Sequence, residues 1–440
     1  MVRVKIHRGS HQIGGTITEV YTENTHIFID FGCELTTDPE ESTDEHMIDM
    51  IRRAECDAIL FSHYHGDHMG LLEHIPEKDV RGRTIQLAMG KVTGQVLINI
   101  HEALGGFHKA SPEVKAGHGR IIDIISDKSR RVDLSDGGSF QIGDFQISCF
   151  QVDHSAYDAY MFILQAEGKV IVHTGDFRTH GRLGENMFST LEERLKGKEV
   201  DVLITEGTMM SRTKERVMTE KEMEREAFRV LSKAENRYAF LICSSTNMES
   251  LASFANAALY QKPRIAFYVN SYVYQQILLY RKTAGEDDEA FRFWKTYPFE
   301  SMNWINPKFG MTQVDYMRKN GFLMLIGKNS NYRKRMDYFK DLNPLLIYSM
   351  WDGYVNKDGD AYDPDWGRVY HSWDPDRLIT LHTSGHATSE DLRQMILTVK
   401  PRQAILPIHT NTPDRFRQLD IGDYANRVEN WKDGNIYEIS

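Results

Sequence analysis

The chain has 440 residues, which is too long for one compact core, so two domains are expected. Hydrophobic residues make up 41% and charged residues 26%, as is typical of a soluble globular enzyme, and the net charge of −10 excludes a uniformly basic surface of the kind that attracts nucleic acid. No apolar run approaches the ~18 residues that span a bilayer, and the start, MVRVKIHRGSHQIGG, lacks the apolar segment of a secretory signal, so we expect a cytoplasmic protein with no membrane partner.

The first two hundred residues predict a strand-rich domain. Short runs rich in Val, Ile, Phe or Tyr end in Gly, Asp or a polar turn, which is typical of strands. The expected strands are residues 26–32, 58–63, 85–90, 145–150, 160–165, 169–176 and 201–207. Helical patterns lie between some of them, at 44–54 and 92–104.

The pattern changes near residue 208. Thr219 followed by Glu222 is a capping box, which predicts that a helix begins there. Strands and helices then alternate, which is typical of a parallel sheet covered on both faces. The expected strands are 238–245, 264–270, 322–328 and 345–350, and the helices are 248–261, 272–284 and 333–342.

The strand-rich pattern returns after residue 376, with a strand at 378–386, a helix at 389–400 and a strand at 404–410. The simplest arrangement is an α/β domain of residues 209–376, inserted into a strand-rich domain that residues 1–208 begin and residues 377–440 complete.

The stretch FSHYHGDHMG concentrates residues of the types that bind metal ions. On an extended segment, residues two apart point to the same side, so His63 and His65 can bind one ion. After a turn at Gly66, Asp67 and His68 can bind a second. Imidazole and carboxylate ligands suit Zn²⁺, Mn²⁺ or Fe²⁺, and the lack of thiolates favours a catalytic site. A solvated polar loop is the alternative, which this density of ligand residues disfavours.

This HxHxDH motif resembles the signature of the metallo-β-lactamase superfamily. Further elements of the family pattern follow in the family's order: the Gly14–Gly15 turn, Asp30 in FIDFG, His154 in VDHS and Asp176 in HTGDF. The resemblance implies an α/β fold class, with an αββα sandwich that carries a metal pair between its sheet edges. The inserted parallel-sheet domain would be its cap.

The resemblance also implies two sets of ligands for two divalent ions per chain. The first ion would be held by His63, His65 and His154. The second would be held by Asp67, His68 and His409, with Asp176 shared between the two. Asp30 would orient ligands or the attacking water. Zn²⁺ is the expected metal and Mn²⁺ the alternative.

Three further motifs resemble those around the insertion of the β-CASP nucleases, a group that includes ribonuclease J. Glu206 in ITEGT precedes the insertion, His386 in TSGHAT follows it, and His409 in PIHT ends the last strand. By this resemblance His386 touches the scissile phosphate and protonates the leaving oxygen, while Glu206 orients that imidazole. Residues 382–410 are most similar to ribonuclease J, although Thr410–Asn411 replace its Gly-Glu and its C-terminal domain has no counterpart here.

The resemblance implies a metal-dependent phosphodiester hydrolase of the ribonuclease J type, acting as an exonuclease, an endonuclease or both and leaving a 5′-phosphate. Single-stranded RNA is the expected partner. A DNA nuclease stays open because water attack on phosphorus needs no 2′-hydroxyl, and so do a small-molecule phosphodiester or ester hydrolase, a silent scaffold and a homodimer. The expected catalytic residues are Asp67, His386, Glu206 and Asp30.

Residues that hold the substrate are expected beside His386 and in the insert. Ser384 and Gly385 are small enough for a phosphate to approach the backbone, and Ser244 and Ser245 lie at a strand-to-helix turn that suits phosphate. Two other groups have either a substrate role or a structural one, and the roles of Arg178 and His180 are open. These groups are the basic residues Lys328, Arg333, Lys334 and Arg335 and the aromatic residues Trp351 and Tyr354.

Overall fold

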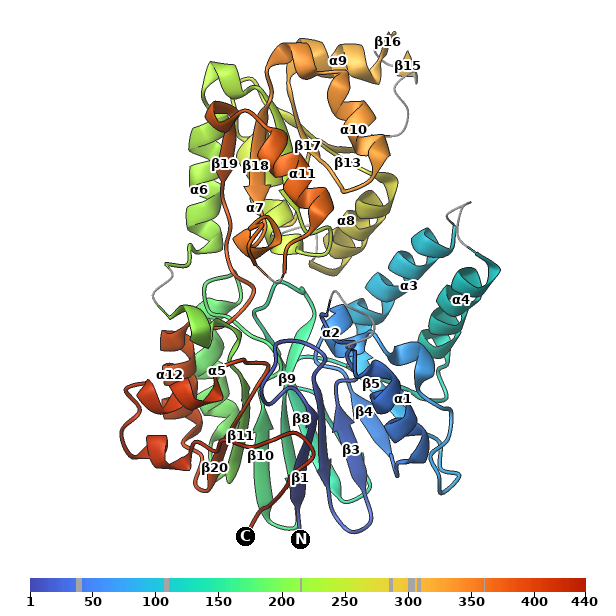
Figure 1. Cartoon of the computed structure of the whole chain (residues 1–440), viewed down its shortest axis with the longest axis vertical. Coiled ribbons are helices and arrows are strands. Elements are labelled where there is room, and N and C mark those ends of the chain that lie inside the picture. Colours follow the sequence, from blue (N-terminus) through green and yellow to red (C-terminus); the bar gives the residue numbers. More distant parts are fainter. Residues whose placement is uncertain are drawn as a thin grey trace. The chain divides into compact units, whose positions relative to one another are not determined.

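A computed structural model describes residues 1–36, 42–106, 111–213, 216–284, 288–299, 305–306, 310–359 and 361–440 of the chain. The chain forms two compact units. Unit 1 comprises Met1–Thr179, Leu183–Arg216 and Gly385–Ser440, and unit 2 comprises His180–Arg182 and Val217–Ser384. Each unit has its own sheets and core, and each is described here separately (Figure 1).

The units divide later in the chain than the expected domain boundaries at 208/209 and 376/377. On the first side, Arg415 Nη1 donates to the carbonyl oxygens of Met210 and Ser211 at 3.1 Å each, which holds this segment on unit 1. On the second side, Leu378–Thr380 pairs in parallel with the sheet of unit 2. Hydrogen bonds beyond the reach of local sequence patterns therefore decide both positions.

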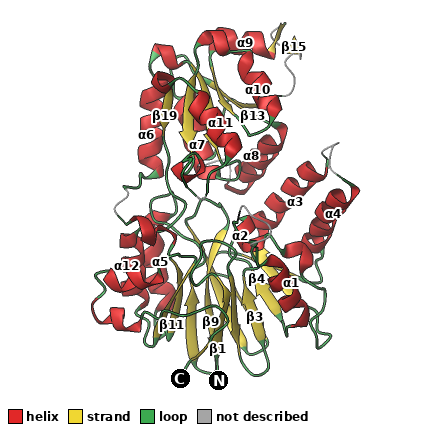
Figure 2. Ribbon diagram, viewed as in Figure 1, coloured by secondary structure: helices red, strands yellow, loops and turns green. Residues whose placement is uncertain are grey.

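Unit 1 is built on two sheets (Figure 2). The first has the order β21-β1-β2-β3-β4-β5-β6 and the second the order β20-β11-β10-β9-β8-β7. The first sheet contains β1 (Arg3–Arg8), β2 (Ile17–Tyr21), β3 (His26–Ile29), β4 (Ala58–Leu60), β5 (Gln86–Gly90), β6 (Arg131–Leu134) and β21 (Ile436–Glu438). The second contains β7 (Ser139–Ile142), β8 (Phe145–Val152), β9 (Ala159–Ala166), β10 (Lys169–His173), β11 (Val202–Glu206) and β20 (Ala404–Ile408).

Apolar side chains of both sheets form the main core of unit 1. Along β1, Val4 and Ile6 point into this core, whereas Lys5 and His7 point outward, as the two-residue repeat of a strand requires. Phe162 of β9 reaches the same core from the second sheet. Burial of apolar surface between two sheets is the main force that holds a sandwich together.

Helices cover the outer faces of the sheets. The outer face of the second sheet packs against α5 and α12 through a second apolar cluster, and the outward residues of β1 and β2 share a hollow with α1. The helices of unit 1 are α1 (Asp44–Arg53), α2 (Gly66–Met69), α3 (Lys91–Gly105), α4 (Pro112–Ser126), α5 (Met187–Leu195) and α12 (Ser389–Val399). Its 3-10 helices are η1 (Leu72–His74), η2 (Gly184–Asn186), η3 (Thr208–Arg212), η8 (Pro413–Gln418) and η9 (Gly422–Arg427).

Unit 2 is built on a parallel sheet of order β14-β13-β17-β12-β18-β19. Its strands are β12 (Tyr238–Cys243), β13 (Ala266–Val269), β14 (Thr296–Pro298), β17 (Phe322–Leu325), β18 (Leu345–Ser349) and β19 (Leu378–Thr380), beside a short pair β15 (Ile305–Asn306) and β16 (Met311–Thr312). Its helices are α6 (Glu220–Leu231), η4 (Ala234–Asn236), α7 (Met248–Leu259), α8 (Ser271–Ala284), α9 (Gln313–Asn320), α10 (Ser330–Asp337), η5 (Lys340–Leu342), η6 (Asp352–Tyr354), α11 (Pro364–Ser372) and η7 (Pro375–Arg377).

The predicted fold class is confirmed: a mixed α/β chain in which a parallel-sheet unit interrupts a two-sheet unit. The predicted capping box is present, because Glu222 N donates to Thr219 Oγ1 at 3.1 Å and Thr219 N donates to Glu222 Oε2 at 2.9 Å. Several elements had no prediction, among them β1, β2, β6, β7, β21, α4, α5, α9 and α11. Within the described ranges, every helix is too short or too polar to cross a bilayer.

Candidate metal centre

The predicted site residues lie where strands of unit 1 end. Asp30 follows β3, and His63 begins the loop shortly after β4, which is parallel to β3. In the second sheet β10, β11 and β20 are parallel, and β8 has the same direction because both β8 and β10 are antiparallel to β9. The carboxyl ends of these strands therefore share an edge, where His154, Asp176 and His409 leave β8, β10 and β20.

The loop with the metal-binding motif turns differently from the expectation. His65 is extended (φ −68°, ψ 150°) and caps the short helix α2, whose first residue is Gly66. Gly66 thus turns the chain by entering a helix and does not use a left-handed conformation. The helix points Asp67 and His68 toward the second ligand group.

The Gly14–Gly15 turn is shaped by its approach to this loop. Both glycines have positive φ, +82° and +65°. A Cβ on Gly14 would lie 2.6 Å from the side chain of Leu35 and 3.2 Å from Cβ of Asp67, so only glycine lets the β1–β2 turn lie against Asp67. Thr16 N donates to the Asp67 carbonyl at 3.1 Å and ties the two segments together.

Three histidines form the first potential ligand group. His63 Nε2 and His65 Nδ1 are 3.0 Å apart, and His154 Nε2 lies 3.3 Å from the same His65 atom. Burial, reinforced by the neighbouring imidazoles, lowers the pKa of His63 and of His154 well below the ordinary value. Burial also lowers the pKa of His65, to about 4. Neutral imidazoles are the form that binds a metal ion.

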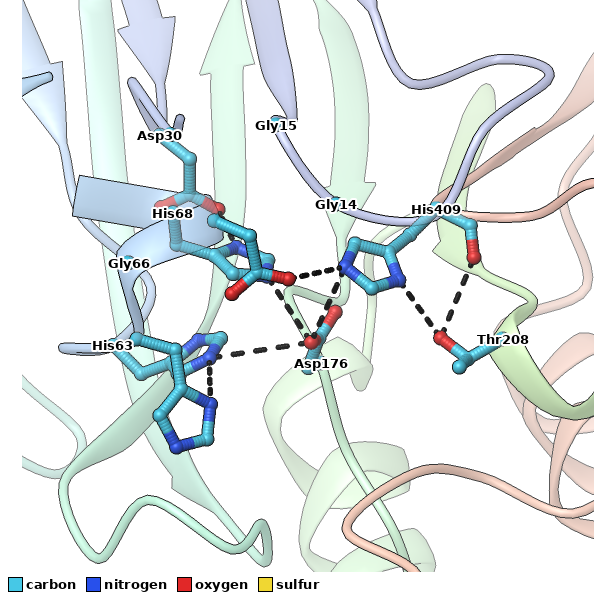
Figure 3. A network of polar contacts seen from close by, with 12 residues as sticks. Gly14, Gly15, Asp30, His63, Gly66, His68, Asp176, Thr208 and His409 are labelled. Atoms are coloured by element: carbon cyan, nitrogen blue, oxygen red, sulfur yellow. Dashed lines mark hydrogen bonds and ion pairs between the residues drawn. The ribbon is translucent and has the colours of Figure 1, made fainter. Parts of the chain in front are cut away.

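Asp67, His68 and His409 form the second potential group. His409 Nε2 lies 3.1 Å and His68 Nε2 3.8 Å from Asp67 Oδ2. Asp176 faces both groups, because its Oδ2 is 3.1 Å from His68 Nε2, 3.8 Å from His409 Nε2 and 4.0 Å from His63 Nε2 (Figure 3). A single carboxylate oxygen is therefore in position to bridge two ions.

Hydrogen bonds to the opposite ring nitrogens hold these imidazoles in place. His68 Nδ1 donates to Asp30 Oδ2 at 2.8 Å. Ser62 Oγ also donates to Asp30 Oδ2, at 2.8 Å, so this hydroxyl accepts from His63 Nδ1 at 3.0 Å. Asp30 thus orients one ring of the first group through Ser62 and one of the second group directly, as outer carboxylates do in metal sites.

Two further outer contacts had no prediction from the sequence. Thr208 Oγ1 is hydrogen-bonded to His409 Nδ1 at 2.8 Å, and His154 Nδ1 donates to the carbonyl oxygen of Gly385 at 2.5 Å. A Cβ on Gly385 would lie 2.6 Å from Ser155 Oγ and 3.3 Å from His154 Cε1, so the glycine is required for this approach. Threonines and backbone carbonyls are too common for the sequence to reveal such contacts.

The charges and unpaired atoms fit divalent cations. His68 Nε2 is buried and makes no hydrogen bond, although it faces carboxylates. Burial opposes ionisation of Asp67 and Asp176, but the nearby imidazoles hold the pKa of both carboxyls below the ordinary value. Asp176, Asp30 and Asp67 in turn raise the pKa of His68 against the effect of burial. A cation would take the place of that proton and compensate the buried carboxylates.

His386 and Glu206 lie beside this centre. His386 Nδ1 is 3.3 Å from Glu206 Oε1 and 3.5 Å from Asp176 Oδ2. Glu206 is fully buried and accepts from the amides of Phe177, Thr208 and Ala387 at 3.2 Å each. Burial opposes protonation of His386, but Glu206 and Asp176 outweigh it and raise its pKa to about 9. The pair is arranged to keep a protonated imidazole at the edge of the centre.

The residues expected to bind phosphate divide between the units. Gly385 and His386 belong to unit 1, whereas Ser384, Ser244 and Ser245 belong to unit 2. The Ser384 carbonyl oxygen is hydrogen-bonded to His180 Nε2 at 2.7 Å. Ser244 Oγ lies 3.0 Å from Thr246 Oγ1 in the turn between β12 and α7. Phosphate binding by these serines stays a prediction.

Arg178, whose role was open, forms a buried ion pair. Its Nε donates to Asp153 Oδ1 at 2.6 Å and its amide donates to the Asp153 carbonyl at 2.7 Å. The other oxygen of Asp153 accepts from the amides of Leu183 and Gly184. Because Asp153 precedes His154, this network positions the chain at the first ligand group.

The basic and aromatic groups of the insert have different surroundings. Lys328 pairs with Asp363, and Arg335 lies over the rings of Phe299 and Tyr332, so two members of the basic cluster serve unit 2 itself. Trp351 and Tyr354 contact each other edge to face and are each 37% exposed, so they are not the core residues that one alternative expected.

Comparison with known proteins agrees with the fold and the site. The model of the beta-lactamase superfamily domain matches residues 37–242, which include the ligand groups except His409. The chain belongs to the metallo-β-lactamase superfamily. The Zn-dependent metallo-hydrolase RNA specificity domain matches residues 376–418, which carry His386 and His409. With the inserted parallel sheet, this second match assigns the chain to the β-CASP branch of the superfamily.

A solved structure has the same fold over nearly the whole chain. The crystal structure of a protein of unknown function from Enterococcus faecalis V583 is 22% identical, with a TM-score of 0.66, over 94% of this chain and 95% of that one. None of the curated proteins matches the sequence. Membership of the superfamily makes this protein a metal-dependent hydrolase that binds divalent ions, with a domain of the RNA-specificity type.

Proposed function

We propose that this metallo-β-lactamase superfamily member is a phosphodiesterase that hydrolyses single-stranded RNA in the manner of ribonuclease J and leaves a 5′-phosphate. The observation that carries the proposal is the His386–Glu206 pair, which lies within 3.5 Å of the Asp176 oxygen that faces both ligand groups. A hydrolase of small esters has no need of a second acid at this place. The RNA specificity domain contains His386 and supports RNA as the substrate.

In this proposal seven residues hold two divalent ions, which Zn²⁺ or Mn²⁺ fits by ligand type. His63, His65 and His154 hold one, Asp67, His68 and His409 hold the other, and Asp176 holds both. When bound, the ions lower the pKa of water and polarise the phosphate. Asp30 and Thr208 keep ring nitrogens of His68 and His409 turned toward the ions through the contacts described above.

His386 is the proposed proton donor to the leaving 3′-oxygen. Its imidazole is partly exposed, whereas Glu206 behind it is fully buried and fixed by backbone amides. The carboxylate therefore orients the ring and stabilises its charged form, while the exposed side remains accessible to a phosphate. Removal of a general acid of this kind costs about 10²- to 10⁴-fold in rate.

Two substitutions separate metal binding from proton transfer. His65→Ala is expected to lose bound metal and RNA cleavage together, because it removes a central atom of the first group. His386→Ala is expected to keep its metal, measured by elemental analysis, and to cleave RNA about 10²- to 10⁴-fold more slowly. His46→Ala, at an exposed position of α1, is the matched control and should behave as the parent. Cleavage by His386→Ala at the parental rate would show that the proton donor is wrongly assigned.

The substrate class is tested by a direct comparison. The parent protein is incubated with end-labelled single-stranded RNA, with the same sequence as DNA, and with bis-p-nitrophenyl phosphate. We expect RNA to be cleaved fastest and its products to carry 5′-phosphates. Turnover of the small diester alone would refute the proposed nuclease function. Product maps of 5′-phosphorylated and 5′-triphosphorylated RNA then distinguish cleavage from the end from internal cleavage.

A further inference from the structure

A hollow in unit 2 has a character unlike that of the rest of the chain. It lies between α10, η5, α11 and η7 and has a volume of about 670 Å³. Every residue that lines it belongs to unit 2. These residues are Arg333, Met336, Asp337, Lys340, Asn343, Pro344, Arg368, Val369, Ser372, Trp373, Asp374 and Arg377.

The hollow carries a local excess of positive charge. Four of its lining side chains are cationic and two are carboxylates, although the whole protein has a net charge of −10. Acidic surroundings normally leave each surface cation close to a carboxylate. A hollow in which cations outnumber acids attracts anions, and most strongly an anion with several charges.

Two of the cations are unpaired. Within the described ranges, Arg333 and Lys340 make no hydrogen bond and no ion pair, and the nearest carboxylate of Arg368 belongs to Asp365 at 3.5 Å. Arg377 differs, because its guanidinium donates to Asn236 Oδ1 at 2.8 Å and to the carbonyl of Glu235 at 2.9 Å. The hollow thus combines one rigid cation with three whose charges are available to a ligand.

Trp373 adds an aromatic surface to the charges. Its ring meets Phe240 edge to face, with centroids 5.9 Å apart and an interplanar angle of 87°. It also lines the hollow and is only partly buried. A ring anchored at one side and open at the other is suited to stack against a nucleobase, which binds to such rings in single strands.

We propose that this hollow is an auxiliary binding site for single-stranded RNA on unit 2. Backbone phosphates contact Arg333, Lys340 and Arg368, and a base stacks on Trp373. The choice of RNA rests on the proposed function, whereas the anionic character of the ligand follows from the hollow itself. Its lining includes Arg333 but not the other members of the basic run in the sequence, because the fold directs Lys328 and Arg335 to partners within unit 2.

The test measures RNA binding without cleavage. In the full chain with His386→Ala, binding of a fluorescent 20-nucleotide oligouridylate is followed by anisotropy over a range of salt concentrations. Adding Arg333→Gln and Lys340→Gln should weaken binding about tenfold at 0.1 M salt and reduce the slope of log affinity against log salt by about 1.4, since each lost phosphate contact contributes about 0.7. Trp373→Leu should weaken binding without changing that slope, because stacking releases no counterions.

The matched control removes the same charge from another face of unit 2. Arg281 and Lys282 are exposed in the last turn of α8, and the pair Arg281→Gln and Lys282→Gln should bind RNA as the parent does. Equal weakening by both pairs, or parental binding by the Arg333 and Lys340 pair, would overturn the inference. RNA bound through the hollow but left uncut by the parent would instead count against the proposed nuclease function alone.

Discussion

At the scale of single residues, two site residues adopt a backbone conformation that side chains disfavour. Asp30 has φ +61° and His409 has φ +52°, in the left-handed region. A conformation of this kind costs about 1 kcal/mol or more and persists only where surrounding contacts enforce it. His409 N donates to the Gly9 carbonyl at 2.7 Å, and Thr208 holds the ring. The strain directs His409 Nε2 toward Asp67, which is the kind of use that strained residues have in active sites.

Thr208 provides a test of this orientation. Thr208→Val keeps the shape of the side chain but removes the hydroxyl beside His409 Nδ1, so the imidazole loses its hold. We expect the affinity for one of the two metal ions to fall about 10- to 100-fold, as is usual when an outer partner is removed. Competition with a fluorescent chelator measures this affinity. Thr208→Ser, which retains the hydroxyl, should bind metal as the parent does, and an unchanged affinity in Thr208→Val would contradict the assigned role.

At the scale of elements, the outer face of the first sheet contains a polar network away from the metal centre. Glu19 of β2 is 8% exposed and binds two imidazoles, His7 Nε2 at 2.8 Å and His26 Nδ1 at 2.7 Å. The three residues lie on β1, β2 and β3, so the network ties neighbouring strands together. Burial raises the pKa of Glu19, but its hydrogen bonds to His26 and His7 outweigh this and lower the value from 4.5 to about 2.

This network predicts how stability responds to acid. Because the folded-state pKa of Glu19 is below the unfolded-state value, the stabilisation is complete above pH ~5 and is lost as the pH falls toward 2. Its size is roughly 2–3 kcal/mol. Urea denaturation should show Glu19→Gln to be less stable than the parent at pH 6 and nearly equal to it close to pH 2. A stability difference that is the same at both pH values would contradict the network.

At the scale of the whole molecule, the two units are stabilised in different ways. Unit 1 has apolar clusters between its sheets and under α5 and α12, together with the buried carboxylates of the centre. Unit 2 has its own cluster around the parallel sheet, with Phe240 and Phe322 in it. Among the described residues, each group that fits a metal ion belongs to unit 1.

Metal removal should therefore weaken unit 1 selectively. A ligand bound only to the folded state stabilises it by about 2.7 kcal/mol at 100 times its dissociation constant, and a chelator removes this contribution. Hydrogen exchange with and without chelator should show faster exchange in β4, β10 and β20 and unchanged exchange in β12 and β18. His65→Ala, which already lacks metal, should show no response to chelator. An equal loss of protection in both units would contradict this division.

Much of the fold could be predicted because local signals agree with the tertiary structure. Hydrophobic strand patterns, the Thr219–Glu222 capping box and the strand–helix alternation of the insert lead to the observed sheets. The missed elements have weaker signals: β1 alternates polar and apolar residues through RVKIHR, and β6 and β7 are four residues each. The domain boundaries depend on contacts of Arg415 and β19 with distant segments, which no local pattern reports.

The sequence by itself determined the superfamily, the α/β class and the types of residue at the candidate centre, because ligand chemistry restricts these positions to His and Asp at short, recognisable spacings. Only the tertiary structure decided which atoms meet. It oriented His63, His68, His154 and His409 through Ser62, Asp30, the Gly385 carbonyl and Thr208, and it separated Arg333 from Lys328 and Arg335. Orientation depends on hydrogen bonds between residues far apart in the chain, and the spacing of residues carries no record of them.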